Sequence, residues 1–303
     1  MRLFHLGLFF ILFCITVVFI DVAIGSDNIA NQKLGEEDSM SPAFSEQTNI
    51  ILGPYQQSTN FTLRYKRDES RNVLTSLVIR EVGVILSYHL GLPKSVEVYA
   101  RVPVLWKTRI GEDYLEYTES KDGTLGIGDL SLGAKCVFLR EKRLVPDVIG
   151  TLEAILPTMS NFYILDDKDL GLGLGYWSIA LGMTVIKSSD PVVIYGGLTY
   201  VYLFEKKYNR RTIYPGAVVV CNLGTAIAVN DKLVLGGQVI GLYYPKIKID
   251  SKKVLFSSSE PIMFKISLAY ALNKDIFFEP TLSCGLNEDA DDVALTLSCN
   301  RRF

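Results

Sequence analysis

Histidine, the base of Ser-His and Cys-His catalysis, is scarce in this sequence. The chain has two histidines, and of these only His89 lies outside the apolar N-terminal stretch. Ser87 stands two positions earlier, which places both side chains on one face of an extended strand. Nucleophilic catalysis also needs a third group that orients the histidine. No recognisable motif supplies such a partner, so we expect the protein not to be an enzyme.

The sequence also lacks the spacing of a metal or nucleotide site. Its histidines and cysteines form no cluster of the kind that binds zinc. The acidic stretch 287–292 could offer oxygen ligands to Ca²⁺, although we favour a solvated turn. The glycines at 171, 173 and 175 follow a loop and open no helix, so they do not predict a phosphate site. We expect no metal and no cofactor.

The alternation of the predicted strands indicates which way their charged residues point. Apolar residues alternate with polar or small ones from Val293 to Phe303, and this period of two indicates a strand between two different environments. The stretches 95–109, 261–272 and 275–286 alternate in the same way. An apolar outer face and a polar interior are typical of membrane β-barrels. The pattern therefore predicts a lumen lined by Glu97, Arg101, Lys135, Glu153, Lys265 and Glu279.

These six side chains carry both signs of charge, so strong ion selectivity is not implied. Two interpretations stay open. The charges could tune the passage of solutes through a pore, or opposite charges could pair and close a narrow lumen. Small barrels are filled by side chains, whereas barrels of 16 strands leave a channel, and a barrel of about 12 strands lies between these cases.

The whole chain divides into strands of similar length. We predict twelve of them, at residues 60–67, 74–90, 95–109, 124–140, 146–157, 173–187, 191–205, 214–229, 232–249, 261–272, 275–286 and 292–303. Most are long enough to cross a bilayer as tilted strands, which need about 9–11 residues. Their connections alternate between short and long, as in barrels with short periplasmic turns and longer outer loops. The expected fold is all-β, a transmembrane antiparallel up-and-down β-barrel of about 12 strands.

Two places break the alternation. Arg80 and Glu81 are adjacent charges in one predicted strand, so one of them would face lipid unless a bulge near Gly83 shifts the register. Gly236 and Gly237 could act similarly in the ninth strand.

The N-terminal region differs from the rest. Residues 1–25 read as a signal peptide, with an apolar run and the small residues Ala23 and Gly25 at a cleavage site. The alternative is an uncleaved anchor. Residues 26–59 are polar and predict a flexible periplasmic segment or a plug, and residues 60–303 form the barrel. The net charge of −2 argues against a nucleic-acid partner.

Four cysteines remain after the signal peptide: Cys136, Cys221, Cys284 and Cys299. An even number in an exported chain is compatible with two disulfides. Each cysteine, however, lies on the apolar face of its predicted strand, where it can act as a small hydrophobic residue. We favour free thiols.

The end of the chain resembles that of bacterial outer-membrane barrels, whose last strand usually ends in an aromatic residue. This resemblance makes Phe303 a signal for the barrel-assembly machinery. It also implies outer-membrane lipid as a partner and the outer membrane of a Gram-negative bacterium as the location.

A motif in the middle of the chain covers about 35 positions and contains Gly126, Gly128, Asp129, Gly133, Lys135, Pro146, Asp147, Pro157 and Thr158. It resembles a motif of the outer-membrane family named for the meta pathway of phenol degradation. Cys136 and Met159 depart from the family pattern, which has an aromatic and a glycine there. A structural role is the favoured interpretation of these residues, in which the glycines permit close packing and Asp129 caps a loop.

The resemblance implies a channel or transporter for passive passage of small solutes, with hydrophobic or aromatic compounds as candidates. Two other functions remain open. The barrel could be a structural or adhesive protein that displays surface loops. It could also be a lipid-modifying enzyme that uses His89. A soluble secreted β-sandwich is the rival fold.

Overall fold

The computed structural model describes residues 55–69, 75–93, 95–113, 118–142, 145–158, 172–208, 210–254 and 257–302. The strands in these ranges are β1 (Tyr55–Glu69), β2 (Thr75–Leu92), β3 (Val96–Asp113), β4 (Thr118–Ile127), β5 (Leu130–Leu139), β6 (Asp147–Leu156), β7 (Ser178–Ser189), β8 (Val192–Leu203), β9 (Lys206–Tyr208), β10 (Arg211–Tyr214), β11 (Ala217–Asn230), β12 (Leu233–Tyr243), β13 (Lys248–Ile249), β14 (Lys252–Lys253), β15 (Ile262–Ala271), β16 (Ile276–Gly285) and β17 (Val293–Arg302). The predicted signal peptide lies outside the described residues, and the predicted segment 26–59 reaches them only at β1.

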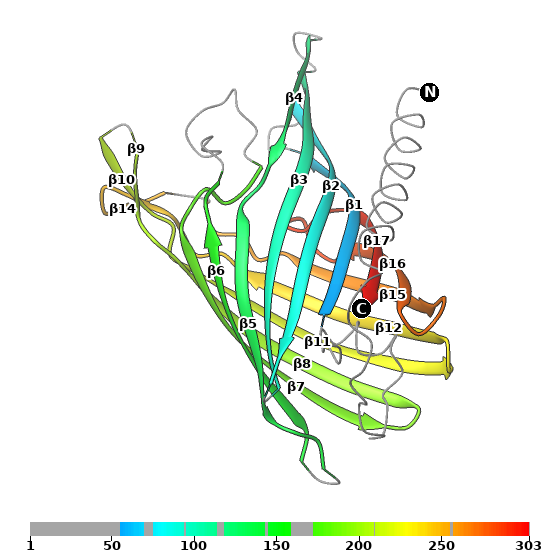
Figure 1. The fold of residues 1–303 in the computed structure, drawn as a ribbon. Coiled ribbons are helices and arrows are strands. Elements are labelled where there is room, and N and C mark those ends of the chain that lie inside the picture. The colour runs from blue at the N-terminus through cyan, green and yellow to red at the C-terminus, as the bar shows by residue number, and fades with distance from the viewer. Residues whose placement is uncertain are drawn as a thin grey trace, which may run out of the picture. The chain divides into compact units, whose positions relative to one another are not determined.

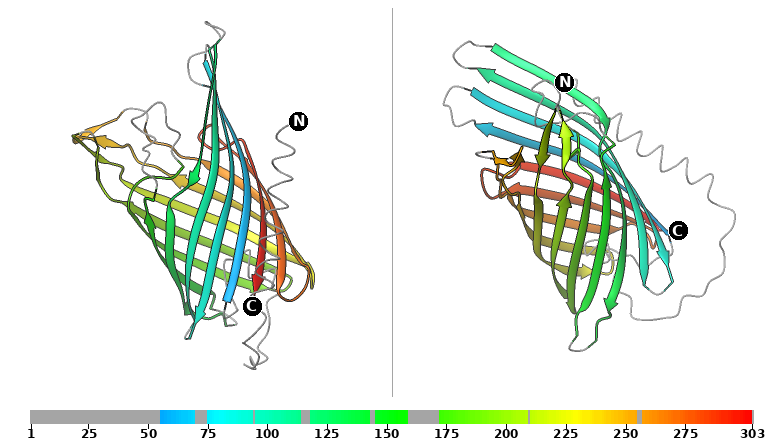
Figure 2. Two further views of the ribbon diagram at one scale, coloured as in Figure 1. Left: turned by 45° about the horizontal axis from the view of Figure 1, so that its top comes forward. Right: turned by 90° about the vertical axis from the view of Figure 1, so that its left-hand side faces the viewer.

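The longer strands form one closed antiparallel barrel (Figures 1 and 2). Hydrogen-bonded neighbours follow the order β2-β1-β17-β16-β15-β12-β11-β8-β7-β6-β5-β3, and the pairing of β2 with β3 closes the circle. β1 pairs directly with β17, so the first and last described strands complete the wall. The predicted antiparallel barrel of about 12 strands is confirmed.

One predicted strand is divided in two. The range 124–140 was expected as a single strand, but β4 ends at Ile127 and β5 begins at Leu130. Residues 96–101 of β3 pair with β5, and residues 104–113 of β3 pair with β4. β4 is therefore an additional strand that extends the sheet beyond the barrel proper.

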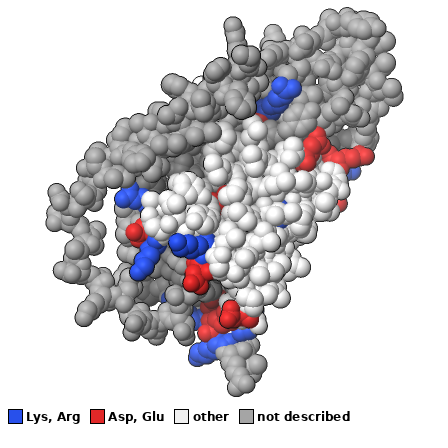
Figure 3. Space-filling view, turned by 90° about the vertical axis from the view of Figure 1, so that its right-hand side faces the viewer, with Lys and Arg blue, Asp and Glu red and all other residues white. Residues whose placement is uncertain are grey.

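The two faces of the barrel wall differ in side-chain type. On β15 the exposed positions are Ile262, Phe264, Ile266, Leu268 and Tyr270, and the positions between them are less exposed. Residues of this outer face are large and apolar on most strands, which matches the lipid-facing band of membrane barrels. Figure 3 shows one side of the molecule, where the described surface is largely white and the charged residues gather toward its margins.

Neither of the two possible bulges occurs. β2 pairs with both of its neighbours in unbroken register through Gly83, and β12 does so through Gly236 and Gly237. Instead, the register shifts between residues 228 and 230 of β11 and between residues 137 and 139 of β5.

The adjacent charges Arg80 and Glu81 need no bulge, because they lie far along β2. About 9–11 residues of a tilted strand cross the bilayer, and β2 runs for 18 residues. With Leu92 near one membrane surface, Arg80 lies near the other surface, where it is exposed. Glu81 points to the inner face and pairs with Lys107.

The connections are sorted between the two ends of the barrel. One end, called the short-turn end below, carries the turns β2–β3, β5–β6, β7–β8, β11–β12 and β15–β16. The opposite end is called the long-loop end. Two of its predicted loops, 206–213 and 250–260, contribute to a small sheet of order β14-β13-β10-β9. Figure 1 shows this sheet projecting beyond β8.

The β5–β6 turn is fastened to β7 through Glu141. The Lys187 ammonium donates to its carboxylate at 2.7 Å, and the backbone amide of Ser188 donates at 3.1 Å. Burial acts to raise the pKa of Glu141, but these hydrogen bonds outweigh it and leave the pKa lowered.

All four cysteines of the barrel are free thiols, and Cys221 and Cys284 are exposed on the outer face. Among the described residues, no helix is long and apolar enough to cross a membrane.

Candidate functional site

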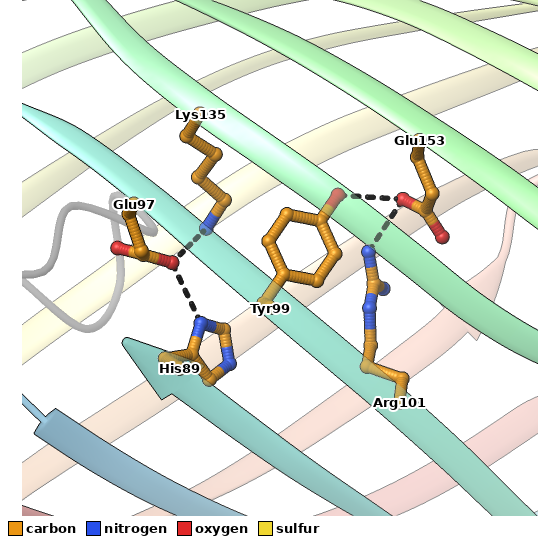
Figure 4. A network of polar contacts seen from close by, with 6 residues as sticks. All are labelled: His89, Glu97, Tyr99, Arg101, Lys135 and Glu153. Carbon is orange, nitrogen blue, oxygen red and sulfur yellow. Dashed lines mark hydrogen bonds and ion pairs between the residues drawn. The ribbon is translucent and has the colours of Figure 1, made fainter. Parts of the chain in front are cut away.

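Charged and polar side chains of β2, β3, β5 and β6 form a connected cluster on the inner face near the short-turn end. Its six members are shown in Figure 4 and are His89, Glu97, Tyr99, Arg101, Lys135 and Glu153. We call this set the lumenal polar cluster. Alternation along β3 places three of its members on the inner face, because residues 97, 99 and 101 are two positions apart.

Glu97 is the centre of one half of the cluster. Its carboxylate lies 2.7 Å from Nδ1 of His89 and 3.7 Å from the Lys135 ammonium. The three side chains are between 9% and 14% exposed. A buried carboxylate is costly unless it is paired and hydrogen-bonded, and His89 and Lys135 supply these contacts to Glu97.

Glu153 is the centre of the other half. It accepts hydrogen bonds from the Tyr99 hydroxyl at 2.8 Å and from the Arg101 guanidinium at 2.6 Å. Its side chain is 13% exposed, whereas that of Arg101 is 41% exposed. Arg101 is therefore the member of this pair that is most accessible to a solute in the lumen.

Tyr99 joins the two halves. Its ring lies 4.8 Å from the Arg101 guanidinium carbon and 5.3 Å from the Lys135 nitrogen. The His89 ring stacks on it with centroids 5.5 Å apart. Cations over an aromatic face are attracted by its quadrupole, so the phenol ring separates two positive groups and stabilises both.

A glycine of the sequence motif makes room for this ring. Gly133 pairs directly with Tyr99 across the sheet, and a Cβ at this position would collide with the ring. The same arrangement recurs on another wall, where the Tyr195 ring lies over Gly224 and its hydroxyl donates to Gln238 at 3.1 Å.

The wall beyond the polar cluster is apolar at the same end of the barrel. A buried cluster runs over β6, β7, β8, β11, β12, β15 and β16 and consists of Ile149, Ile186, Val193, Tyr195, Ala226, Val234, Ala269, Ala271 and Phe277. Ile186, Val234 and Phe277 have no exposed surface. The inner face therefore has a charged arc and an apolar arc near the short turns.

The predicted lumen residues fall into two groups. Glu97, Arg101, Lys135 and Glu153 lie together in the polar cluster, which also contains His89 and Tyr99. Lys265 on β15 and Glu279 on β16 are half-buried. In the strand order, β7, β8, β11 and β12 separate these two strands from β6. The role of all six in lining a passage stays a prediction. Tyr99 could have been included from strand parity alone, since it lies two residues from Glu97 on β3. His89 lies on β2 and reaches this face through its pairing with Tyr99.

The family motif forms a separate structural junction at the break between β4 and β5. The amide of Gly128 donates to the Pro103 carbonyl at 2.8 Å, and the Thr158 hydroxyl donates to the Gly128 carbonyl. The Asp129 carboxylate accepts from the amide of Gly175 at 3.0 Å. The junction thus fastens both described ends of the long connection between β6 and β7.

The other motif residues lie along the same strands. Gly126 is in β4, Gly133 and Lys135 are in β5, Pro146 precedes β6, Asp147 begins β6 and Pro157 follows it. The Asp147 carboxylate accepts from the amide of Glu141 at 2.5 Å. Met159 and Phe303 lie outside the described residues.

The acidic stretch before β17 has a structural use. The Asn287 side chain accepts from the amide of Ile262 at 3.0 Å, and the Asp289 carboxylate accepts from the amide of Glu260 at 2.6 Å. These contacts join two long-loop connections. Within the described ranges, no group of three or more His, Cys, Asp or Glu is arranged to hold a metal ion.

Solved structures with a similar fold are outer-membrane barrels. An outer membrane channel from Pseudomonas putida F1 superposes with a TM-score of 0.65 at 14% sequence identity, over 84% of this chain and 97% of that chain. The translocator domain of the autotransporter NalP from Neisseria meningitidis gives a TM-score of 0.53 at 10% identity, over 87% and 93%. At these identities the likeness concerns the fold.

The family assignment rests on the sequence itself. A family model described as "Putative MetA-pathway of phenol degradation" matches residues 40–303, which include every described strand. This agrees with the resemblance carried by the junction residues around Asp129. The described strands form a barrel of the outer-membrane type, and the chain belongs to the MetA-pathway phenol degradation family.

Proposed function

We propose that this protein is an outer-membrane channel for passive passage of small solutes that carry both an aromatic ring and a polar group. The observation that supports this is the division of the inner face near the short turns. A charged arc around Tyr99 is followed by an apolar arc around Ile186 and Phe277. Ile186 and Phe277 are buried within this arc, but Val137 and Ala228 pack against it and are partly exposed. A solute with one apolar and one polar side can therefore contact both arcs at once.

The polar cluster suits solutes that hydrogen-bond. The exposed Arg101 guanidinium offers donors to a carboxylate or phenolate, and Glu153 already accepts from a phenol, the Tyr99 side chain. Because the cluster contains both signs of charge, it does not impose a strong barrier on either ion sign. Phenols and aromatic carboxylates are the class that we propose.

The proposed orientation places the short turns in the periplasm and the long loops outside the cell, as is usual for outer-membrane barrels. In this proposal a signal peptide is removed near Gly25, and the segment that follows it lies on the periplasmic side. Phe303 would be recognised by the barrel-assembly machinery, and outer-membrane lipid would surround the apolar wall.

Solute flux into liposomes tests the proposed solute class. The purified mature protein is reconstituted, and the uptake of benzoate is compared with that of gluconate, a carboxylate without an aromatic ring. We expect benzoate to enter several-fold faster. Equal rates for the two anions would contradict the proposed class while leaving a general channel possible.

A pair of variants tests the apolar arc itself. Val137→Ser places a hydroxyl at a partly exposed position beside the apolar arc and should reduce the preference for benzoate. Val239→Ser makes the same change at an exposed position of the outer face and should leave the preference unchanged. If both variants behave alike, the apolar arc does not select the solute.

A further inference from the structure

The small sheet at the long-loop end is strongly basic. Its strands and their flanking residues contain Lys206, Lys207, Arg210, Arg211, Lys246, Lys248, Lys252 and Lys253, against two acidic residues, Glu205 and Asp250. The complete chain has 31 basic and 33 acidic residues, so this excess is local. We call the sheet β14-β13-β10-β9 the basic sheet.

Strand register separates its two faces, because directly paired residues of an antiparallel ladder point to the same side. Ile213 pairs with Ile249, and both pack with the buried residues Leu203 and Val218 of the barrel's inner face. This face of the basic sheet therefore continues the inner wall.

The other face continues the outer wall and carries the exposed lysines. Thr212 pairs with Lys207, Tyr214 pairs with Lys248, and Lys248 pairs with Lys253. All three lysines are exposed. They point away from the lumen axis, to the side where the membrane surrounds the barrel.

Aromatic side chains lie on the outer wall where β7, β8 and β12 meet the long-loop end. They are Trp177, Tyr200, Tyr202, Phe204 and Tyr243, which are 41% to 59% exposed. Aromatic belts mark the boundary between hydrocarbon and headgroups in membrane barrels. This group therefore marks the boundary at the long-loop end.

The dimensions place the lysines at headgroup level. β8 has 12 residues, which span about 40 Å along a strand and about 30 Å across a bilayer at the usual barrel tilt. That is the thickness of the hydrocarbon core. Lys207 follows Phe204 by three residues, or about 10 Å, and so lies beyond the hydrocarbon among the headgroups.

The two acidic residues are engaged inside the basic sheet. The Asp250 carboxylate accepts from the amide of Thr212 at 2.8 Å. Glu205 forms a hydrogen bond with the Tyr214 hydroxyl and raises the pKa of that group by its charge. Both carboxylates thus form hydrogen bonds within the basic sheet. With eight basic and two acidic residues, the net charge of the sheet is positive.

We propose that the outer face of the basic sheet binds the phosphate groups of a phosphorylated glycolipid in the outer leaflet of the outer membrane. Lysines act as point charges for phosphate, and basic residues near an anionic membrane surface attract its headgroups. A soluble anion on its way to the lumen is the less suitable occupant, because Lys207, Lys248 and Lys253 face away from the lumen. This inference rests on the proposed orientation and does not require that solutes pass through the barrel.

The test uses the mature protein in neutral detergent and native mass spectrometry. The protein is titrated with bisphosphorylated lipid A and, in parallel, with the same lipid after its phosphates are removed. The test variant is Lys207→Gln/Lys248→Gln/Lys253→Gln. The matched control is Lys142→Gln/Lys232→Gln/Lys274→Gln, which removes three exposed lysines from the short-turn end.

We expect the phosphorylated lipid to bind the native protein more tightly than the dephosphorylated lipid. The test variant should weaken this binding by about 10-fold to 100-fold, since each lysine contributes about fivefold near an anionic surface. The control variant should change it less than about twofold. A third variant that replaces the same three lysines by arginine should retain binding, which separates loss of charge from loss of fold.

Three results would overturn the proposal. The first is equal affinity for the two lipids. The second is an equal loss of binding in the test and control variants, which would indicate a general charge effect. The third is displacement of the lipid by millimolar inorganic phosphate, which would identify a site for a free anion instead. Because none of these results depends on solute flux, they leave the proposed channel function untouched.

Discussion

The substitution Glu153→Gln tests whether the polar cluster sets the ion preference of the lumen. Glu153 carries the negative charge opposite Arg101, with 2.6 Å between the paired atoms. Glutamine keeps an oxygen that can accept from Tyr99 but removes the charge. The guanidinium, which is 41% exposed, then faces the lumen without a neutralising partner in this half of the cluster.

The size of the effect follows from Coulomb's law. A unit charge about 5 Å from a passing ion contributes about 0.8 kcal/mol in water, and salt near 0.1 M reduces this to about 0.5 kcal/mol. The contribution has opposite signs for cations and anions. Their permeability ratio should therefore move toward anions by about fivefold. The partly exposed pair should cost only about 1 kcal/mol of stability.

The assay is the reversal potential of single channels in a gradient of potassium chloride. Arg101→Gln removes the opposite charge and should shift the preference toward cations. Asp275→Asn lies in an exposed short turn and serves as the control with no expected shift. An unchanged reversal potential in Glu153→Gln, measured on protein that has folded, would refute the assignment of this cluster to the conduction path.

Three other outcomes are expected. Gly133→Ala should displace the Tyr99 ring and destabilise the barrel by about 1–3 kcal/mol, measured by urea unfolding; an unchanged midpoint would show that the ring has room to move. The lowered pKa of Glu141 means that its contribution to stability is present above the unfolded pKa and is lost as pH falls through the lower folded pKa. Glu141→Gln should therefore flatten the acid side of the stability profile, and a profile identical to the native one would contradict this. Cys221 and Cys284 face outward, so in liposomes they should react with a lipid-soluble maleimide and resist a charged one; rapid labelling by the charged reagent would place them in water.

Much of the barrel could be predicted from the sequence, because a strand between lipid and lumen has two unlike faces. Alternation located β15 and β17 within one or two residues of their observed ends. The same parity placed Glu97 and Arg101 on one side of β3. The side-chain period of two fixes the register of each strand, since a slip of one residue would turn every apolar group inward.

Other features depend on contacts between distant residues, which alternation does not encode. The break after Ile127 depends on Thr158 and Gly175, which contact Gly128 and Asp129 from another connection. β9, β14 and most of β10 were expected as loops, and β13 was expected as the end of the strand 232–249. The charged residues of this region hide the alternation that would mark a separate sheet. Contacts such as that of His89 with Glu97 require the register of the β2–β3 hairpin, which the turn residues alone did not fix.

Single-channel recording of the purified mature protein in a planar bilayer tests the central claim most directly. We predict steady ohmic current steps, because the proposed function requires an open water-filled path along the polar cluster. A protein that shows the heat-dependent gel shift of a folded barrel but gives no current steps would contradict the proposed channel.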